Sequence, residues 1–366
     1  LSAFKQFLEA GMKINSEEGG ASCESRIDVH GCPLINPPVE IVQQGSEAIL
    51  GYFNEIELQG IDRLYEAKVL ILGEGGAGKT SLLRRLYRTD LGLPNEREST
   101  KGIDIYHHEF SHTEGRPFRL NVWDFGGQQI YHSTHQFFLT KRSLYILVDD
   151  TRNDSTTIHD QGFKYWLEVV EALSSSCPVL IFQNEKAGRS KTIDESGIKG
   201  RFPNVKEIYR GNLFQADAAK CLEEAIRFHV QTLPHVGDEV PAQWARIRSH
   251  LENLKKESPC ISFGAYLAVY EQYLPKDKSK ALMLSQYFHD LGVFLHFQDD
   301  MVLTRTVILQ NEWATEAVFK VLDDESTKAK NGYFTMIDCQ RIWAESTYAD
   351  MHLELLALME KFELCY

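Results

Sequence analysis

The sequence has no long hydrophobic run, no cluster of basic residues and no signal-peptide pattern. Its apolar stretches are the length of a β-strand, far short of the roughly 20 residues that a membrane-spanning helix needs. The formal net charge is −13 at pH 7, and no run of Lys or Arg offsets it, which argues against a general polyanion binder. We therefore expect neither a membrane span nor nucleic-acid binding.

The cysteines also lack the spacing of a metal site or a disulfide framework. Seven cysteines are scattered along the chain, and none falls in a CxxC pair. An odd, dispersed set indicates free thiols in a reducing compartment, so a cytoplasmic location is expected. The chain begins with Leu rather than Met and stops within the helix-like stretch "MEKFELCY". We expect it to be a piece of a larger protein.

A chain of 366 residues is too long for one compact core. Residues 1–60 hold a short strand-like piece, a Gly/Pro/Asn turn and a helix from about Glu40, and they bury little on their own. Residues 61–236 form the second expected domain. A linker with two prolines, "TLPHVGDEVP", precedes the third, residues 237–366.

Residues 67–232 alternate strand-like and helix-like segments, which predicts an α/β fold. We expect a mixed, mostly parallel six-stranded sheet with helices on both faces. The short, turn-rich segment "SHTEGRP" predicts an antiparallel hairpin between the second and third strands. Helices are expected over 80–87, 163–173 and 216–231. The predicted strands span 68–72, 103–110, 118–123, 143–148, 179–182 and 205–209.

The last part of the chain has a different pattern. "PAQWARIRSHLENL" and later stretches are helical, and "GVFLHFQDDMVLTRTVIL" predicts a β-hairpin among them. Helices with one small hairpin are typical of an α+β, winged-helix-like module. Asp299 and Asp300 lie at the hairpin turn, where a DNA-binding wing would carry Arg or Lys, so DNA binding is not expected.

The stretch "KVLILGEGGAGKTSLLRRL" matches G-x-x-x-x-G-K-[ST] directly after a strand and before a helix. Glycines allow the backbone to approach phosphates closely, and the loop N–H groups and the helix N-terminus converge on the β-phosphate. Lys79 adds a charge at the β- and γ-phosphates, and the Thr80 hydroxyl ligates Mg²⁺. The alternative is a glycine-rich turn without a ligand. The loop consists of Gly73, Glu74, Gly75, Gly76, Ala77 and Gly78.

Two further segments fit a nucleoside triphosphate site. Thr100 lies in a polar loop before the second strand, where it can reach both Mg²⁺ and the γ-phosphate. "LNVWDFGGQQ" ends the third strand with Asp124, which can hold a Mg²⁺-bound water, and Gly127, whose N–H can meet the γ-phosphate. Gln128 is placed to orient the attacking water. Taken singly, Thr100 is more often a loop residue and Asp124 a strand-end turn residue. The phosphate-loop motif alone does not distinguish ATP from GTP, and these two segments narrow the choice.

With these motifs in order, residues 60–235 resemble a Ras-like small G domain. "WDFGGQQIYHSTHQFFLTKRSLYILVDDTRND" is similar to the Ras-of-complex-proteins (Roc) domain of the Roco family, which includes the leucine-rich-repeat kinases. In that family a C-terminal-of-Roc (COR) domain follows, and residues 241–366 fit its N-terminal part. "NPPVEIVQQGSEAILGYF" resembles the end of a leucine-rich-repeat array.

The resemblance implies roles for particular residues. Gly73 to Thr80 bind the phosphates, with Ser81 near the α-phosphate; Thr80, Thr100 and Asp124 serve Mg²⁺. Arg152, in "DDTRND", corresponds to an arginine finger that neutralises transition-state charge. The alternative is a surface Arg paired with Asp150 or Asp154. The pair His132 and His135 lacks a third ligand in the sequence, so no metal besides Mg²⁺ is expected.

The base-reading segment departs from the family pattern. "PVLIFQNEKAGRS" has Asn184, but the Lys of Asn-Lys-x-Asp comes one place late as Lys186, and the Asp is missing. Asn184 can still bond the base and tie down the phosphate loop, and Lys186 can cover the purine face. The lost carboxylate accepts hydrogen bonds from guanine N1 and N2. Glu185 or Asp194 replaces it only if the loop bends, so we expect guanine with loosened selectivity or affinity.

The sequence thus predicts Mg²⁺-dependent binding of GTP and GDP and slow GTP hydrolysis. The resemblance implies that the nucleotide state is transmitted to COR and alters homodimerisation, although this fragment is expected to be monomeric. One alternative is a nucleotide-binding signalling and dimerisation scaffold with little hydrolysis. Another is a P-loop ATPase, suggested by the missing Asp.

Overall fold

The structure is a computed structural model that describes residues 2–10, 13–15, 26–28, 36–95, 100, 102–113, 115–126, 142–152, 161–174 and 177–365. The chain forms two compact units. One combines residues 1–64 with 234–311, and the other combines residues 65–233 with 312–366. Within the described residues, no helix combines the length and apolar character needed to cross a membrane.

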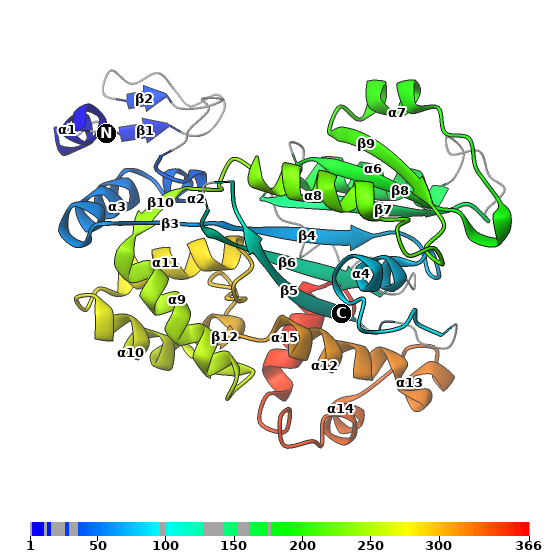
Figure 1. The fold of residues 1–366 in the computed structure, drawn as a ribbon. Coiled ribbons are helices and arrows are strands. Elements are labelled where there is room, and N and C mark those ends of the chain that lie inside the picture. The colour runs from blue at the N-terminus through cyan, green and yellow to red at the C-terminus, as the bar shows by residue number, and fades with distance from the viewer. Residues whose placement is uncertain are drawn as a thin grey trace. The chain divides into compact units, whose positions relative to one another are not determined.

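The second unit is built on a six-stranded sheet with the order β5-β6-β4-β7-β8-β9 (Figure 1). All neighbouring strands are parallel except the β5–β6 hairpin at one edge. The expected hairpin and the mostly parallel sheet are confirmed. The strands are β4 Glu66–Leu72, β5 Ile103–Ser111, β6 Pro117–Phe125, β7 Ser143–Asp150, β8 Val179–Asn184 and β9 Val205–Gly211.

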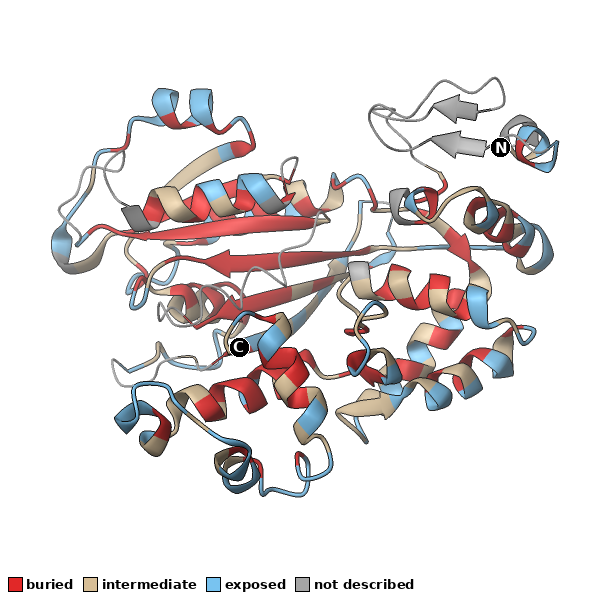
Figure 2. Ribbon diagram, turned by 180° about the vertical axis from the view of Figure 1, so that it is seen from behind, coloured by how far each residue is buried: buried red, intermediate tan, exposed pale blue. Residues whose placement is uncertain are grey.

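Burial along the strands explains why each expected strand forms. Every residue of β4, β7 and β8 is buried, as the central strands in Figure 2 show, because helices cover both faces of a parallel sheet. The edge strand β5 instead mixes buried, half-buried and exposed positions. Helices α4 and α8 lie against one face and α6 against the other (Figures 1 and 2). The helices of this part of the chain, with the short helix α7 included, are α4 Lys79–Tyr87, α6 Gln161–Ser174, α7 Glu195–Arg201 and α8 Lys220–Gln231.

The C-terminal helices complete the same unit. The side chain of Phe319 packs against the backbone of Gly102, at the start of β5. Trp313 stacks on Tyr348, and the buried Trp343 donates a hydrogen bond from its indole to the carbonyl of Ala317 at 2.8 Å. The helices are α12 Asn311–Asp323, α13 Glu325–Ala329, α14 Met336–Ile342 and α15 His352–Lys361.

The first unit is mainly helical and has its own hydrophobic core. Tyr52, Trp244 and Tyr287 form the aromatic centre of this core. Two antiparallel strand pairs, β3 with β10 and β11 with β12, and one parallel pair, β1 with β2, lie in this unit. The elements are α1 Ser2–Glu9, β1 Lys13–Asn15, β2 Arg26–Asp28, α2 Val39–Gln43, α3 Ser46–Gln59, β3 Ile61–Arg63, β10 Glu239–Pro241, α9 Ala242–Lys255, β11 Cys260–Ser262, α10 Phe263–Tyr273, α11 Lys278–Asp290, η4 Leu303–Arg305 and β12 Thr306–Ile308.

Three expectations about the elements need correction. The helix expected from about Glu40 is interrupted at Gly45, whose φ of +93° lies outside the helical region. The expected β-hairpin at residues 292–309 is reduced to a single bridge between Leu295 and Ile308, because β12 pairs with β11 instead. The helix expected from residue 216 begins only at Lys220, after a run of turns. The expected domain boundaries at residues 60 and 236 remain a prediction. The two compact units are each made of two separate stretches of the chain and so do not test these boundaries.

Candidate nucleotide-binding site

The segment between β4 and α4 forms a loop that requires glycine at its last position. Gly78 precedes α4 with φ of +107°, which side chains other than glycine rarely adopt. A Cβ at Gly78 would lie only 2.4 Å from Nδ2 of Asn184. The loop and β8 therefore approach more closely than any larger residue would permit. Gly75 and Gly76 are exposed in the middle of the loop, and Ser81 lies in the first turn of α4.

Lys79 folds back onto the phosphate loop. Its ammonium donates hydrogen bonds to the carbonyls of Gly73 at 2.8 Å and Glu74 at 2.9 Å. Burial lowers the pKa of Lys79 to about 8, against the opposing charges of Asp124 and Glu74. A buried cation whose hydrogen bonds go to carbonyl oxygens is suited to anionic ligands.

Thr80, Thr100 and Asp124 converge from three separate segments. The hydroxyl of Thr80 donates to Oδ2 of Asp124 at 2.6 Å, and the hydroxyls of Thr80 and Thr100 are 2.8 Å apart. Thr100 also reaches Oδ2 of Asp124 at 3.2 Å. Burial raises the pKa of Asp124 to about 6, although hydrogen bonds from Thr80 and the charge of Lys79 oppose the shift. The structure thus brings together the three residues assigned to Mg²⁺ from sequence.

The chemistry of this cluster fits a magnesium ion. Mg²⁺ prefers carboxylate and other oxygen ligands, and all three side chains offer oxygen. The Oδ1 atom of Asp124 is buried and has no hydrogen-bond partner among the described residues. Such an atom costs free energy unless a cation or water meets it.

The segment with altered Asn-Lys-x-Asp spacing, residues 184–186, still contacts the phosphate loop. The amide of Asn184 donates to the carbonyl of Ala77 at 2.8 Å, and the ammonium of Lys186 donates to the carbonyl of Gly76. The one-residue displacement of the lysine is accommodated by a 3₁₀ turn, η3 Lys186–Gly188. Both side chains therefore lie at the loop despite the altered spacing.

Arg152 is held by Asp150 next to the phosphate loop. Its guanidinium makes a bidentate pair with Asp150, including 2.7 Å between Nη2 and Oδ2, and Nη2 also lies 3.5 Å from the carbonyl of Gly76. Lys186 approaches the same carboxylate at 3.7 Å. Burial alone raises the pKa of Asp150, but the hydrogen bonds from Arg152 and the charge of Lys186 outweigh it and leave the pKa below its usual value.

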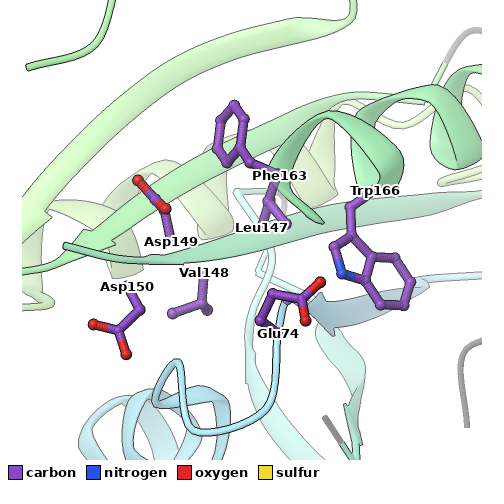
Figure 3. A pocket seen from close by; sticks show the side chains of 8 residues that line it. Glu74, Leu147, Val148, Asp149, Asp150, Phe163 and Trp166 are labelled. Carbon is purple, nitrogen blue, oxygen red and sulfur yellow. The ribbon is translucent and has the colours of Figure 1, made fainter. Parts of the chain in front are cut away.

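A small pocket lies beside the loop, between β7 and α6 (Figure 3). Phe163 and Trp166 of α6 and Glu74 of the loop line it. Figure 3 shows that Asp149 and Asp150, consecutive on β7, point to opposite sides of the strand, with Asp150 on the side of the loop. Asp149 pairs with Lys191 at 3.2 Å and accepts from Gln183 at 3.1 Å.

Sequence motifs did not reveal two contributions to the site. Arg85 on α4 donates to the carbonyls of Leu213 at 2.6 Å and Phe214 at 3.0 Å, and so fixes the loop after β9 beside the phosphate loop. Thr151 donates to the carbonyls of Asn184 and Arg189, which fixes the turn after β8. No motif letter marked Arg85. Thr151 directly follows the two aspartates that end β7, in "DDT".

Other predicted site residues have different outcomes. Gly127 and Gln128 lie outside the described residues, as do His132, His135 and Asp154. Asp194, one candidate for the missing carboxylate, instead caps α7 by accepting from the backbone N–H of Gly197 at 2.9 Å.

The comparisons with known proteins place these features in a family. Residues 68–187 match the family described as Roc, "Ras of Complex, Roc, domain of DAPkinase". Residues 241–366 match COR-A, "C-terminal of Roc, COR-A domain".

Individual relatives agree with these matches. The solved structure of Methanosarcina barkeri Roco2 RocCORdC bound to GDP is 32% identical, with a TM-score of 0.72, and the match covers 84% of this chain and 94% of that one. "Probable serine/threonine-protein kinase pats1" of Dictyostelium discoideum is 28% identical over 93% of this chain, and a Roc-COR-CHAT protease of Runella zeae is 26% identical over 87%. The chain spans only 11% and 36% of the lengths of these two relatives. Together with the six-stranded sheet and its phosphate loop, these matches show that the chain belongs to the Roco family and carries Roc and COR-A domains in tandem.

Proposed function

We propose that this chain binds GTP and GDP with Mg²⁺ at the phosphate loop and hydrolyses GTP slowly. The convergence of Thr80, Thr100 and Asp124 from α4, the loop before β5 and the end of β6 carries the proposal. This geometry suits a site that senses a γ-phosphate and its metal together. The solved Roco2 structure, which is bound to GDP, supports guanine as the base.

Binding follows from the groups at the loop. The N–H groups of Gly73 to Gly78 and the N-terminus of α4 meet the β-phosphate, and the ammonium of Lys79 exchanges its two carbonyl partners for phosphate oxygens. Thr80, Thr100 and Asp124 would hold Mg²⁺, which would supply positive charge to the phosphates. Asn184 and Lys186 position the base against the loop.

Hydrolysis needs charge stabilisation more than covalent chemistry. Gln128 orients the attacking water, and Arg152 supplies a second cation to the phosphates. To do so Arg152 must leave Asp150, which is an energetic barrier consistent with slow turnover. Because Lys186 also approaches Asp150, the carboxylate keeps one cationic partner when Arg152 moves.

The output is a conformational switch. Loss of the γ-phosphate releases Thr100, and Gly102 lies two residues further along, against Phe319 of α12. The COR-A match includes α12, so the contact joins the nucleotide-sensing loop to COR-A within one compact unit. We propose that the nucleotide state acts through this contact on COR and on dimerisation in the full-length cytoplasmic protein.

Single-turnover release of γ-phosphate from GTP tests the enzymatic claim. Wild type is expected to release phosphate in the presence of Mg²⁺, and Arg152→Ala is expected to be at least tenfold slower, by analogy with the larger effects of arginine fingers. Arg116→Ala serves as the control, because Arg116 lies over Tyr65 at the far hairpin. Release no faster than background would contradict the GTPase and favour a scaffold that binds nucleotide without hydrolysis.

A further inference from the structure

We propose that the base pocket does not read the 2-amino group of the purine, so that inosine nucleotides bind about as tightly as guanine nucleotides. The inference rests on the proposed nucleotide-binding function and specifies its selectivity at position 2 of the purine. It follows from the position of the turn after β8 and from the partners of the nearby carboxylates.

The first step fixes the register of the base-reading segment. Lys186, not residue 185, donates to the carbonyl of Gly76, while Asn184 donates to the carbonyl of Ala77. The lysine therefore reaches the loop from one residue later than in Asn-Lys-x-Asp. Counted from this lysine, the position of the carboxylate in Lys-x-Asp falls on Gly188.

The second step shows that the turn is held firmly at this register. The hydroxyl of Thr151 bonds the carbonyls of Asn184 at 3.1 Å and Arg189 at 2.8 Å and accepts from the N–H of Lys186 at 3.3 Å. The N–H of Arg189 closes the turn onto the carbonyl of Lys186 at 3.1 Å. Gly188 has no side chain, and the residue after it is a cation. Residues 188 and 189 therefore do not offer guanine N1 and N2 the carboxylate that Asn-Lys-x-Asp would supply.

The third step accounts for nearby carboxylates. Asn184 and Lys186 direct their side chains to the phosphate loop. Glu185, between them, is the residue before η3, with φ −75° and ψ 87°, and its carboxylate is tested by a variant below. Asp194 caps α7, and Asp149 pairs with Lys191. Asp150 pairs with Arg152 and Lys186.

The consequence concerns two ligands that differ by one group. GDP and IDP share the phosphates, the ribose and the 6-oxo group, and only GDP carries the 2-amino group. A site that hydrogen-bonds such a group rejects the analogue without it by several orders of magnitude. A site that leaves the group in solvent has no basis for a preference.

Competition against a fluorescent GDP analogue tests the inference on the whole chain after removal of copurified nucleotide. IDP is expected to bind within about threefold of GDP, while ADP binds more weakly. A preference for GDP over IDP of tenfold or more would overturn the inference and leave the proposed function intact. Failure of GDP to bind at all would instead overturn the proposed function.

The variant Gly188→Asp tests whether residue 188 is the position from which a carboxylate would read the 2-amino group. At Gly188 φ is +70°, which Asp and Asn tolerate best among residues with side chains, and a Cβ there meets no atom within 4 Å. Gly188→Asp is expected to raise the GDP-to-IDP preference about 10- to 100-fold, the range for hydrogen bonds to a charged acceptor. Gly188→Asn is the matched control for shape and is expected to raise it less. An unchanged preference in a folded Gly188→Asp protein would contradict the assigned position.

Two neutralising variants test one carboxylate in the turn after β8 and one in the loop after β9. Glu185→Gln and Asp217→Asn, the latter in the exposed loop after β9, are each expected to leave the affinity for GDP and the ratio to IDP unchanged. A selective loss of GDP affinity in either variant would identify a carboxylate that reads the 2-amino group and would overturn the inference.

Discussion

Replacement of Gly102 by Ala is expected to destabilise the sheet-containing unit by about 2–5 kcal/mol. Gly102 has φ of +75° and is buried, and a Cβ added to it would lie 2.8 Å and 2.9 Å from two ring carbons of Phe319. It would also lie 3.5 Å from the hydroxyl of Thr315. The alanine therefore meets both an unfavourable backbone conformation and a close contact with a buried ring.

The two contributions can be separated within this chain. The left-handed conformation alone costs about 1–2 kcal/mol for a residue with a Cβ. Overpacking against a buried ring adds about 1–3 kcal/mol. Gly115 has the same φ of +75°, but a Cβ there meets no atom within 4 Å. Gly115→Ala thus measures the backbone cost without the contact, and Gly102→Ala is expected to exceed it by at least about 1 kcal/mol.

Urea denaturation of four proteins measures the contact itself. Wild type, Gly102→Ala, Phe319→Ala and the double variant form a cycle in which Phe319→Ala alone costs about 3–5 kcal/mol. The double variant is expected to be more stable than the sum of the single changes implies, because removal of the ring relieves the clash. If Gly102→Ala costs no more than Gly115→Ala, or if the cycle is additive, the described contact between the loop before β5 and α12 is wrong.

Three further variants test other parts of the structure. Without nucleotide and Mg²⁺, the raised pKa of Asp124 contributes stability that is present below pH 4 and lost as pH rises through about 6, so Asp124→Asn is expected to be more stable than wild type at pH 7 by about 1–3 kcal/mol. Thermal melts in EDTA from pH 4 to 8 check this, and a less stable variant at pH 7 would refute the sign. Trp244→Phe removes the 2.7 Å hydrogen bond from the indole to the buried Glu55, and it is expected to lower the free energy of unfolding by about 1–3 kcal/mol more than Trp313→Phe. Trp313 is the control because its indole N–H has no hydrogen-bond partner among the described residues. Equal losses in urea midpoints would count against the bond. Thr335→Ala removes the hydroxyl that accepts from the N–H of Asp338 in the capping box of α14, while the bond from the backbone N–H of residue 335 to the Asp338 carboxylate remains. The variant is expected to lower stability by about 0.5–2 kcal/mol, whereas an unchanged melting curve would show that the hydroxyl cap is not formed.

The elements of the sheet were predictable because each has a strong local signal. The apolar runs of β4, β7 and β8 are buried on both faces, and the turn-rich segment before β6 forces a hairpin. The pairing of β12 with β11 was not predictable, since a local reading favours a hairpin partner close in sequence. The packing of Phe319 on Gly102 likewise depends on a tertiary contact between distant segments.

The candidate site divides along the same lines. Lys79, Thr80, Thr100 and Asp124 were identified from motif letters, because their side chains carry the chemistry. The loop held by Arg85 was missed because its contribution comes from backbone carbonyls, which no motif letter encodes. Asn184 and Lys186 were identified despite their altered spacing, but only the structure shows how η3 brings the displaced lysine to Gly76.

Direct binding of labelled GDP and labelled ADP in the presence of Mg²⁺ tests the central claim, the assignment of a guanine nucleotide to this phosphate loop. Wild type is expected to bind GDP more tightly than ADP, and Lys79→Met is expected to lose most of the affinity. Lys68→Met is the control, because Lys68 is an equally buried lysine that lies over Trp123 in the sheet, 3.7 Å from the ring centre. Equal affinity for GDP and ADP, or undiminished GDP binding by Lys79→Met, would contradict the account.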